Sequence, residues 1–216
     1  WKVNEPKLVK EQRELSEKLE LYKGVYSKTE STPEMTLRRR VSLYFLLGSV
    51  FLLFAGYNAV MSKMADYLPK VLNINFYDYQ FIIAQVFVIA MIMPIGILSM
   101  ALGRKKTVML GMIILAGTLS SVVFLHENQP WVTAGIIALA GTGLTMISIN
   151  TYVMVVEMSR GDVGRYTGYY YAASMSAQIV TPIVSGILMD KHGRWILFPY
   201  ATVFVVLALI TMLFVK

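Results

Sequence analysis

The sequence of 216 residues has no cysteine and only two histidines. The lack of cysteine excludes a disulfide framework, a thiolate nucleophile and a cysteine-ligated metal. Charge is also scarce, because 15% of the residues are charged and 56% are hydrophobic. Soluble domains have about 25% charged and about 45 to 50% apolar residues. These proportions exclude a globular soluble enzyme and predict a membrane protein.

The few charges are concentrated at the N-terminus, where residues 1–40 hold 17 of the 33. This region has no apolar segment typical of a signal peptide, and the chain opens with Trp1. We therefore expect a part of a longer protein. Residues 1–37 alternate acids and bases, and this pattern fits either a charged cytoplasmic linker or an amphipathic surface helix over residues 7–23.

Six stretches without Asp, Glu, Lys or Arg are each long enough to cross about 30 Å of hydrocarbon. Backbone groups in lipid must be satisfied internally, so each stretch is predicted to be an α-helix. The fold class is therefore an all-α membrane protein. The transmembrane domain covers residues 38–216, with spans at about 41–62, 79–102, 107–125, 131–156, 166–189 and 195–215.

Lys and Arg residues near the span ends predict the orientation, because cytoplasmic loops carry more of them. Nine would lie on the side of the termini and four on the other side. Both termini are therefore expected in the cytoplasm of a cell, in a plasma or bacterial inner membrane. These loops also account for the net charge of +7, so we expect no nucleic-acid partner. The nine are Arg38, Arg39, Arg40, Arg104, Lys105, Lys106, Arg160, Arg165 and Lys216, and the four are Lys63, Lys70, Lys191 and Arg194.

A short pattern at the end of the second span returns 90 residues later, at the end of the fifth span. Because each unit has three spans, the second unit enters the membrane from the opposite side, as in the inverted repeats of transporters. The sequence thus predicts two inverted three-helix repeats. The pattern is Gly96, Ile97, Leu98, Gly103 and Arg104, repeated as Gly186, Ile187, Leu188, Gly193 and Arg194.

The first copy of this pattern resembles the loop motif G-x-L-x-D-x-x-G-R-[KR]-[KR] of the major facilitator superfamily. Met100 stands where the family usually has Asp. A second similarity, to an E…G-[RK]-x-x-G pattern, follows the fourth span at Glu157. The resemblance implies a gating loop that contains Gly96, Gly103, Arg104, Lys105, Glu157 and Arg165.

The resemblance covers the whole chain and implies half of a major facilitator fold. Residues 1–40 would be the central loop and the six spans the C-terminal helices, so an N-terminal six-helix half would be missing. Residues 56–60 and 164–186 are most similar to sucrose/proton symporters and glycoside-pentoside-hexuronide symporters. The implied function is secondary active transport of a small polar solute, a sugar, by alternating access in a lipid bilayer. The coupling carboxylates would belong to the missing half.

Polar residues in the spans indicate a substrate pathway, because polar groups in hydrocarbon are costly. One face of the fifth span is polar over its whole length. Such a stripe faces either a water-filled cavity or another helix, and both alternatives remain open. The stripe consists of Thr167, Tyr171, Ser174, Gln178, Thr181 and Ser185.

Two asparagines, Asn58 and Asn150, lie at related places in the two repeats. Their amides can bind sugar hydroxyls, and an interhelical hydrogen bond is the alternative. Tyr152 and Tyr171 could stack on the apolar face of a sugar ring, and an anchor at the membrane interface is the alternative for a tyrosine near a span end. Gln85 is a further candidate. The predicted pathway is therefore Asn58, Gln85, Asn150, Tyr152, Tyr171, Ser174 and Gln178.

Two alternative functions remain: one half of a drug/proton antiporter, and a six-helix membrane scaffold that does not transport. An antiporter would favour a larger, more aromatic and apolar cavity. The sequence contains no nucleophile elbow, and neither histidine has the carboxylate-rich spacing of a metal site. We therefore expect no enzymatic activity, no cofactor and no metal.

Overall fold

A computed structural model describes residues 14, 15, 17, 18, 37–74, 77–127, 129–159 and 162–215. The chain divides into two compact units, Trp1–Thr36 and Leu37–Lys216. In the first unit, residues 14, 15, 17 and 18 are helical. The rest of the predicted surface helix lies outside the described residues, as do Arg160 and Lys216.

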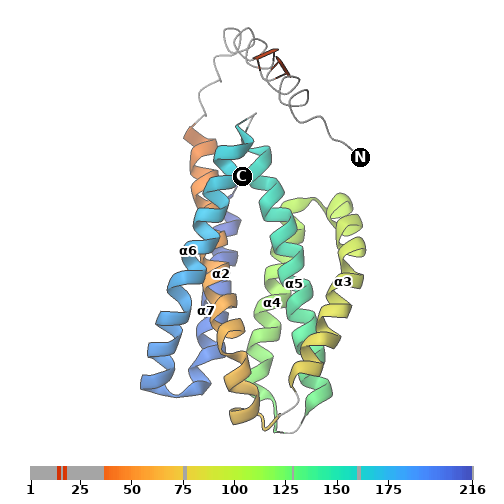
Figure 1. The fold of residues 1–216 in the computed structure, drawn as a ribbon, viewed down its shortest axis with the longest axis vertical. Helices are drawn as coiled ribbons and strands as arrows, with labels where there is room; N and C mark the ends of the chain where they lie inside the picture. The colour runs from red at the N-terminus through yellow and green to blue at the C-terminus, as the bar shows by residue number, and fades with distance from the viewer. Residues whose placement is uncertain are drawn as a thin grey trace, which may run out of the picture. The chain divides into compact units, whose positions relative to one another are not determined.

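The second unit contains six helices that are long and apolar enough to cross a membrane (Figure 1). No strand occurs among the residues that the structure describes. The predicted all-α membrane fold is therefore confirmed. The helices are α2 (Leu37–Val71), α3 (Tyr77–Leu102), α4 (Arg104–Ser121), α5 (Pro130–Glu157), α6 (Val163–His192) and α7 (Leu197–Leu213), with short 3₁₀ turns η1 (Val122–Phe124) and η2 (Arg194–Ile196).

Helix α2 is longer than its predicted span, because it continues from Ser62 to Val71. The charged side chains of Lys63, Asp66 and Lys70 lie in this continuation and do not interrupt the helical backbone. A charge-free stretch predicts the extent of a span and not that of its helix, so the sequence missed the last turns of α2.

The second and third helices of each repeat are joined at a glycine. Gly103 has φ 85° and Gly193 has φ 87°, a region that side chains with a Cβ rarely adopt. These glycines lie 90 positions apart, at equivalent places in the two repeats. The same tight turn therefore follows α3 in the first repeat and α6 in the second.

The helices form two bundles that do not correspond to the two repeats (Figure 1). Helix α2 packs along α6 and α7, while α5 packs along α3 and α4. The first helix of each repeat thus belongs to the bundle of the other repeat. Contacts between α4 and α7 join the two bundles. These are the third helices of the two repeats, so the symmetry that relates the repeats turns this pair into itself, as an inverted repeat requires.

Backbones approach closely where these helices cross. A Cβ atom on Gly111 of α4 would lie 2.7 Å from the carbonyl oxygen of Gly143 on α5. A Cβ atom on Gly56 of α2 would lie 2.7 Å from the carbonyl oxygen of Ala201 on α7. Gly111 and Ala201 are 90 positions apart, so both crossings are the same contact in two repeats. Small residues allow such close packing between membrane helices.

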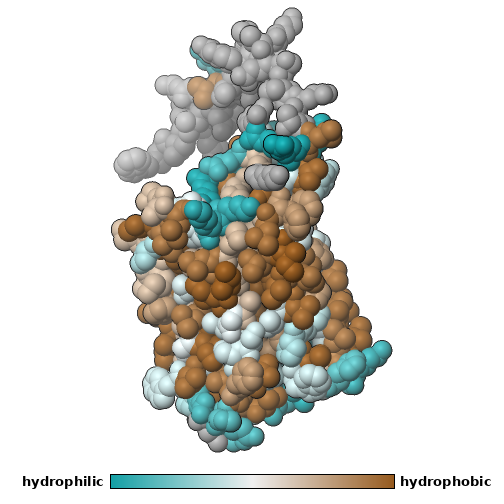
Figure 2. Space-filling model, turned by 180° about the vertical axis from the view of Figure 1, so that it is seen from behind, coloured by the Kyte–Doolittle hydropathy of each residue, from teal (hydrophilic) through white to brown (hydrophobic). Residues whose placement is uncertain are grey.

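The two ends of the six-helix unit differ in the segments that they hold. We call the end with Leu37, the α3–α4 and α5–α6 turns and Val215 the proximal end, and the opposite end the distal end (Figure 1). On the face shown in Figure 2, hydrophobic side chains cover most of the area between the two ends, and strongly hydrophilic side chains gather at the ends. This distribution suits a protein that crosses a bilayer.

Replacing Gly111 with Ala is expected to destabilise the protein by about 1 to 3 kcal/mol, because the new methyl group overpacks the α4–α5 crossing. Thermal unfolding in detergent would measure this effect. Gly117→Ala is the control on the same helix, since no atom lies within 4 Å of its added Cβ. We expect Gly117→Ala to be neutral or slightly stabilising. Equal unfolding temperatures for the two variants would contradict the close crossing.

Candidate functional site

A hollow of about 460 Å³ opens between α5 and α6, which touch over a short part of their length. Its volume lies within the about 300 to 1,000 Å³ typical of small-molecule sites. We call it the tyrosine hollow. It is lined by Phe54, Ser148, Ile149, Tyr152, Val153, Tyr170, Tyr171, Ser174, Met175 and Gln178.

Three tyrosines form the aromatic wall of the tyrosine hollow. The rings of Tyr152 and Tyr170 meet edge to face with centroids 5.4 Å apart, and those of Tyr170 and Tyr171 meet at 5.6 Å. Tyr170 is buried, whereas Tyr171 is 47% exposed. Edge-to-face pairs hold rings in defined positions, so Tyr170 fixes the two rings that reach the open part of the hollow.

The polar stripe of the fifth span is divided between the hollow and the packing surface of α6. Ser174, Thr181 and Ser185 are buried, and α6 packs against α2. Gln178 is exposed and, with Ser174, lines the hollow. Thr181 and Ser185 are thus buried by packing, Gln178 lies at the hollow, and Ser174 does both. That this part of the stripe faces a water-filled pathway stays a prediction.

The tyrosine hollow combines aromatic surface with neutral polar groups. Tyrosine hydroxyls, a serine hydroxyl and the Gln178 amide can both donate and accept hydrogen bonds. None of the ten lining residues carries a charge at neutral pH. The described residues likewise contain no group of three His, Asp or Glu side chains that could hold a metal ion. The hollow therefore suits a neutral polar molecule with an apolar face.

Asn150 lies outside this hollow, in the contact between α5 and α3. Its side chain is buried and accepts a hydrogen bond from the Ser99 hydroxyl. Its amide group donates to the Met146 carbonyl at 2.7 Å. In this structure, Asn150 forms the interhelical hydrogen bond that was the alternative to solute binding.

Asn58 and Gln85 also lie outside the tyrosine hollow. The amide of Asn58 donates to the Phe54 carbonyl of its own helix at 2.8 Å. Gln85 is exposed and lines, together with Tyr57, a separate gap of about 70 Å³ among α2, α3 and α5. A contact of Asn58 or Gln85 with solute stays a prediction.

Three of the six predicted gating-loop residues, Arg104, Lys105 and Glu157, make contacts between helices at the proximal end. Arg104 forms an ion pair with Glu157 at 2.7 Å, and Arg39 of α2 donates to the Glu157 carbonyl at 3.3 Å. Lys105 donates to the carbonyl of Leu213 at 3.1 Å and to that of Val215, at the end of α7. The cations at this end thus connect the two bundles.

The other three gating-loop residues, Gly96, Gly103 and Arg165, have no side-chain contact with Glu157 among the described contacts. Arg165 donates to the Tyr169 hydroxyl at 2.7 Å, one turn along its own helix. Its backbone N–H donates to Asp162, which caps the start of α6. Gly96 is exposed, and Gly103 makes the turn between α3 and α4. A gating role for the loop stays a prediction.

Sequence reasoning missed six of the ten lining residues: Phe54, Ser148, Ile149, Val153, Tyr170 and Met175. The run of three tyrosines at 169–171 was the available signal. Which of the three points to α5 depends on the rotation of α6 about its axis. The pairing of Ser99 with Asn150 likewise requires the α3–α5 packing.

The sequence model of the Major Facilitator Superfamily matches residues 43–216, from the first turns of α2 to the end of the chain. The chain belongs to the Major Facilitator Superfamily. Membership implies the transport of a small solute across a lipid bilayer by a multi-pass membrane protein. No curated protein matched the chain.

Asn150→Ala is expected to lower the free energy of unfolding by about 0.6 to 1.7 kcal/mol, the range for interhelical hydrogen bonds in a membrane. The loss of its bond to Ser99 weakens the α3–α5 contact. Asn58→Ala is the matched control, because its side chain donates to a carbonyl of its own helix and, among the described residues, to no other helix. Thermal or denaturant unfolding of both variants measures the difference. A loss in Asn58→Ala as large as that in Asn150→Ala would contradict this assignment.

Proposed function

We propose that this chain is the C-terminal half of a secondary active transporter that moves a small neutral polar solute, a sugar, by alternating access. The tyrosine hollow carries this proposal. Its aromatic wall can contact the apolar face of a sugar ring, and its hydroxyls and amide can bond to the ring hydroxyls. Tyr152, Tyr171, Ser174 and Gln178 were predicted for this role and all four line the hollow.

The lining of the hollow supports a neutral solute over a charged one. A charged solute in a dry site needs a partner of opposite charge, because desolvating an unpaired ion is costly. No lining residue could supply that charge. A drug/proton antiporter would use the same aromatic wall, so an aromatic organic cation belongs in the transport assay as the competing substrate.

The open side of the hollow supports a partner half. Tyr171, Met175 and Gln178 are exposed on α6 and would otherwise meet lipid. An N-terminal six-helix half placed there would complete the pathway, since transporter sites lie between repeats near the middle of the bilayer. In this proposal the proximal end faces the cytoplasm, because it carries most of the basic residues near span ends.

Substitution of the lining residues in the intact transporter tests this function. Gln178→Ala, Ser174→Ala and Tyr171→Phe should each reduce uptake of a radiolabelled sugar a few-fold, without a change in the amount inserted. The expected size follows from one hydrogen bond, worth about 0.5 to 1.5 kcal/mol. Uptake into vesicles, with and without a proton gradient, is the measurement.

Val180→Ala is the control, because Val180 is exposed on α6 but does not line the hollow. Normal uptake in all three variants would show that the hollow is not the pathway. If the aromatic cation showed saturable uptake and none of the tested sugars did, the proposed substrate would be a drug-like solute and not a sugar.

A further inference from the structure

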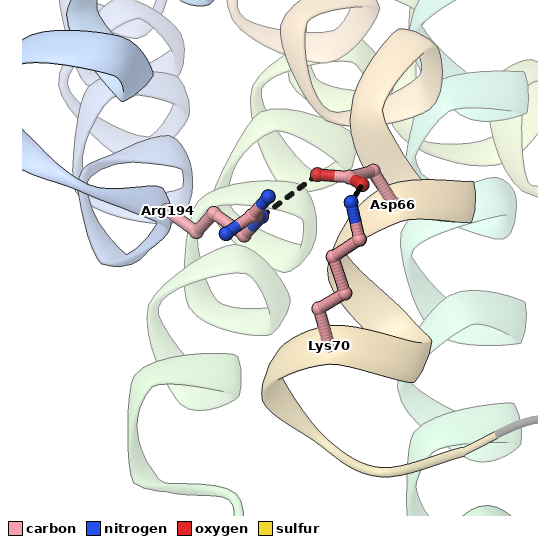
Figure 3. Close-up of polar contacts among 3 residues, drawn as sticks. All are labelled: Asp66, Lys70 and Arg194. Atoms are coloured by element: carbon pink, nitrogen blue, oxygen red, sulfur yellow. Dashed lines mark hydrogen bonds and ion pairs between the residues drawn. The ribbon is translucent and has the colours of Figure 1, made fainter.

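An acidic side chain near the distal end of α2 connects two cations (Figure 3). Asp66 accepts a hydrogen bond from Nε of Arg194 at 2.8 Å and forms an ion pair with Lys70. Lys70 lies one turn further along the same helix, whereas Arg194 belongs to η2 in the α6–α7 turn. The Arg194 pair therefore ties the end of α2 to the start of α7.

This ion pair has a counterpart at the proximal end. Arg104 and Arg194 are 90 positions apart, and each directly follows a glycine with positive φ. Asp66 and Glu157 are 91 positions apart, and each lies near the C-terminal end of the first helix of a repeat. The two pairs are thus the same contact, formed once by each repeat.

The inverted repeat places the two pairs at opposite ends of the unit. Arg194 and Asp66 join the distal ends of α2 and α7 in one bundle. Arg104 and Glu157 join the proximal ends of α4 and α5 in the other bundle. Each bundle therefore has one arginine–carboxylate pair. The pair of the α2–α6–α7 bundle lies at the distal end, and the pair of the α3–α4–α5 bundle lies at the proximal end.

A hollow of about 610 Å³ lies beside the distal pair, between α2 and α6. Asp66 and Arg194 border it, and Met189 of α6 is a buried residue in its lining. Because Met189 is buried in the lining of this hollow, its accessibility would report a movement of the end of α2 away from the α6–α7 turn.

We propose that Asp66 and Arg194 form a distal latch, an ion pair that restricts access to the hollow between α2 and α6 at the face opposite the Arg104–Glu157 pair. The two side chains are 37% and 44% exposed. Partly exposed ion pairs are weak, which suits a contact that opens and closes during a transport cycle. The latch does not depend on which solute is carried.

Cysteine accessibility in the intact protein tests the latch, since the chain has no cysteine of its own. The reporter is Met189→Cys, treated in proteoliposomes with a maleimide and no solute. Asp66→Asn and Arg194→Gln should each raise the labelling rate at least threefold. His192→Cys is the matched reporter, because His192 is exposed beyond the predicted span and does not line the hollow, so its rate should stay constant.

Two further variants separate the latch from a general loss of structure. Lys70→Gln removes only the pair within α2, so it should leave the Met189→Cys rate unchanged. Exchange of the charges, as Asp66→Arg with Arg194→Asp in the Lys70→Gln background, should return the rate to within twofold of the Lys70→Gln parent. Unchanged labelling in the single variants, or no recovery in the exchange, would overturn the proposal.

Discussion

The architecture depends on two close backbone crossings, Gly111 with Gly143 and Gly56 with Ala201. Lipid supplies no hydrophobic force between helices, so association relies on close packing of small residues and on polar contacts. These crossings join the first helix of each repeat to the third helix of the other. The repeats are therefore interlocked, and neither could form its bundle alone.

The tyrosine hollow and both ion pairs follow from this interlocking. Because α5 packs with α3 and α4, it leaves α6 after a short contact, and the hollow opens between these two helices. The same exchange brings Asp66 of the first repeat to Arg194 of the second, and Glu157 of the second to Arg104 of the first. The tyrosine hollow and the end contacts thus use separate surfaces of these helices.

The sequence was sufficient to predict six helices and the repeat, because lipid imposes length and hydropathy on each span. It could not show which helices pack together, since that depends on how each helix is rotated about its axis. Asn150 illustrates this limit, because its partner Ser99 is 51 positions away and becomes visible only with the α3–α5 packing. Asp66 was missed for a related reason, because its helix continues beyond the apolar stretch that predicted it.

Oxidative cross-linking tests the exchange of first helices most directly. Ser49 of α2 donates to the Ala208 carbonyl of α7 at 2.8 Å, so cysteines at these two positions should be joined by an oxidant or by a short bis-thiosulfonate cross-linker, whose disulfide bonds a reductant also breaks. With a protease site inserted at Glu127, between the repeats, the two fragments should stay joined until a reductant is added. In the control variant, Ser49→Cys is combined with Val203→Cys, which lies on an exposed face of α7. The two fragments of this variant should separate without a reductant. Separation of the Ser49–Ala208 pair under oxidising conditions would contradict the interlocked bundles.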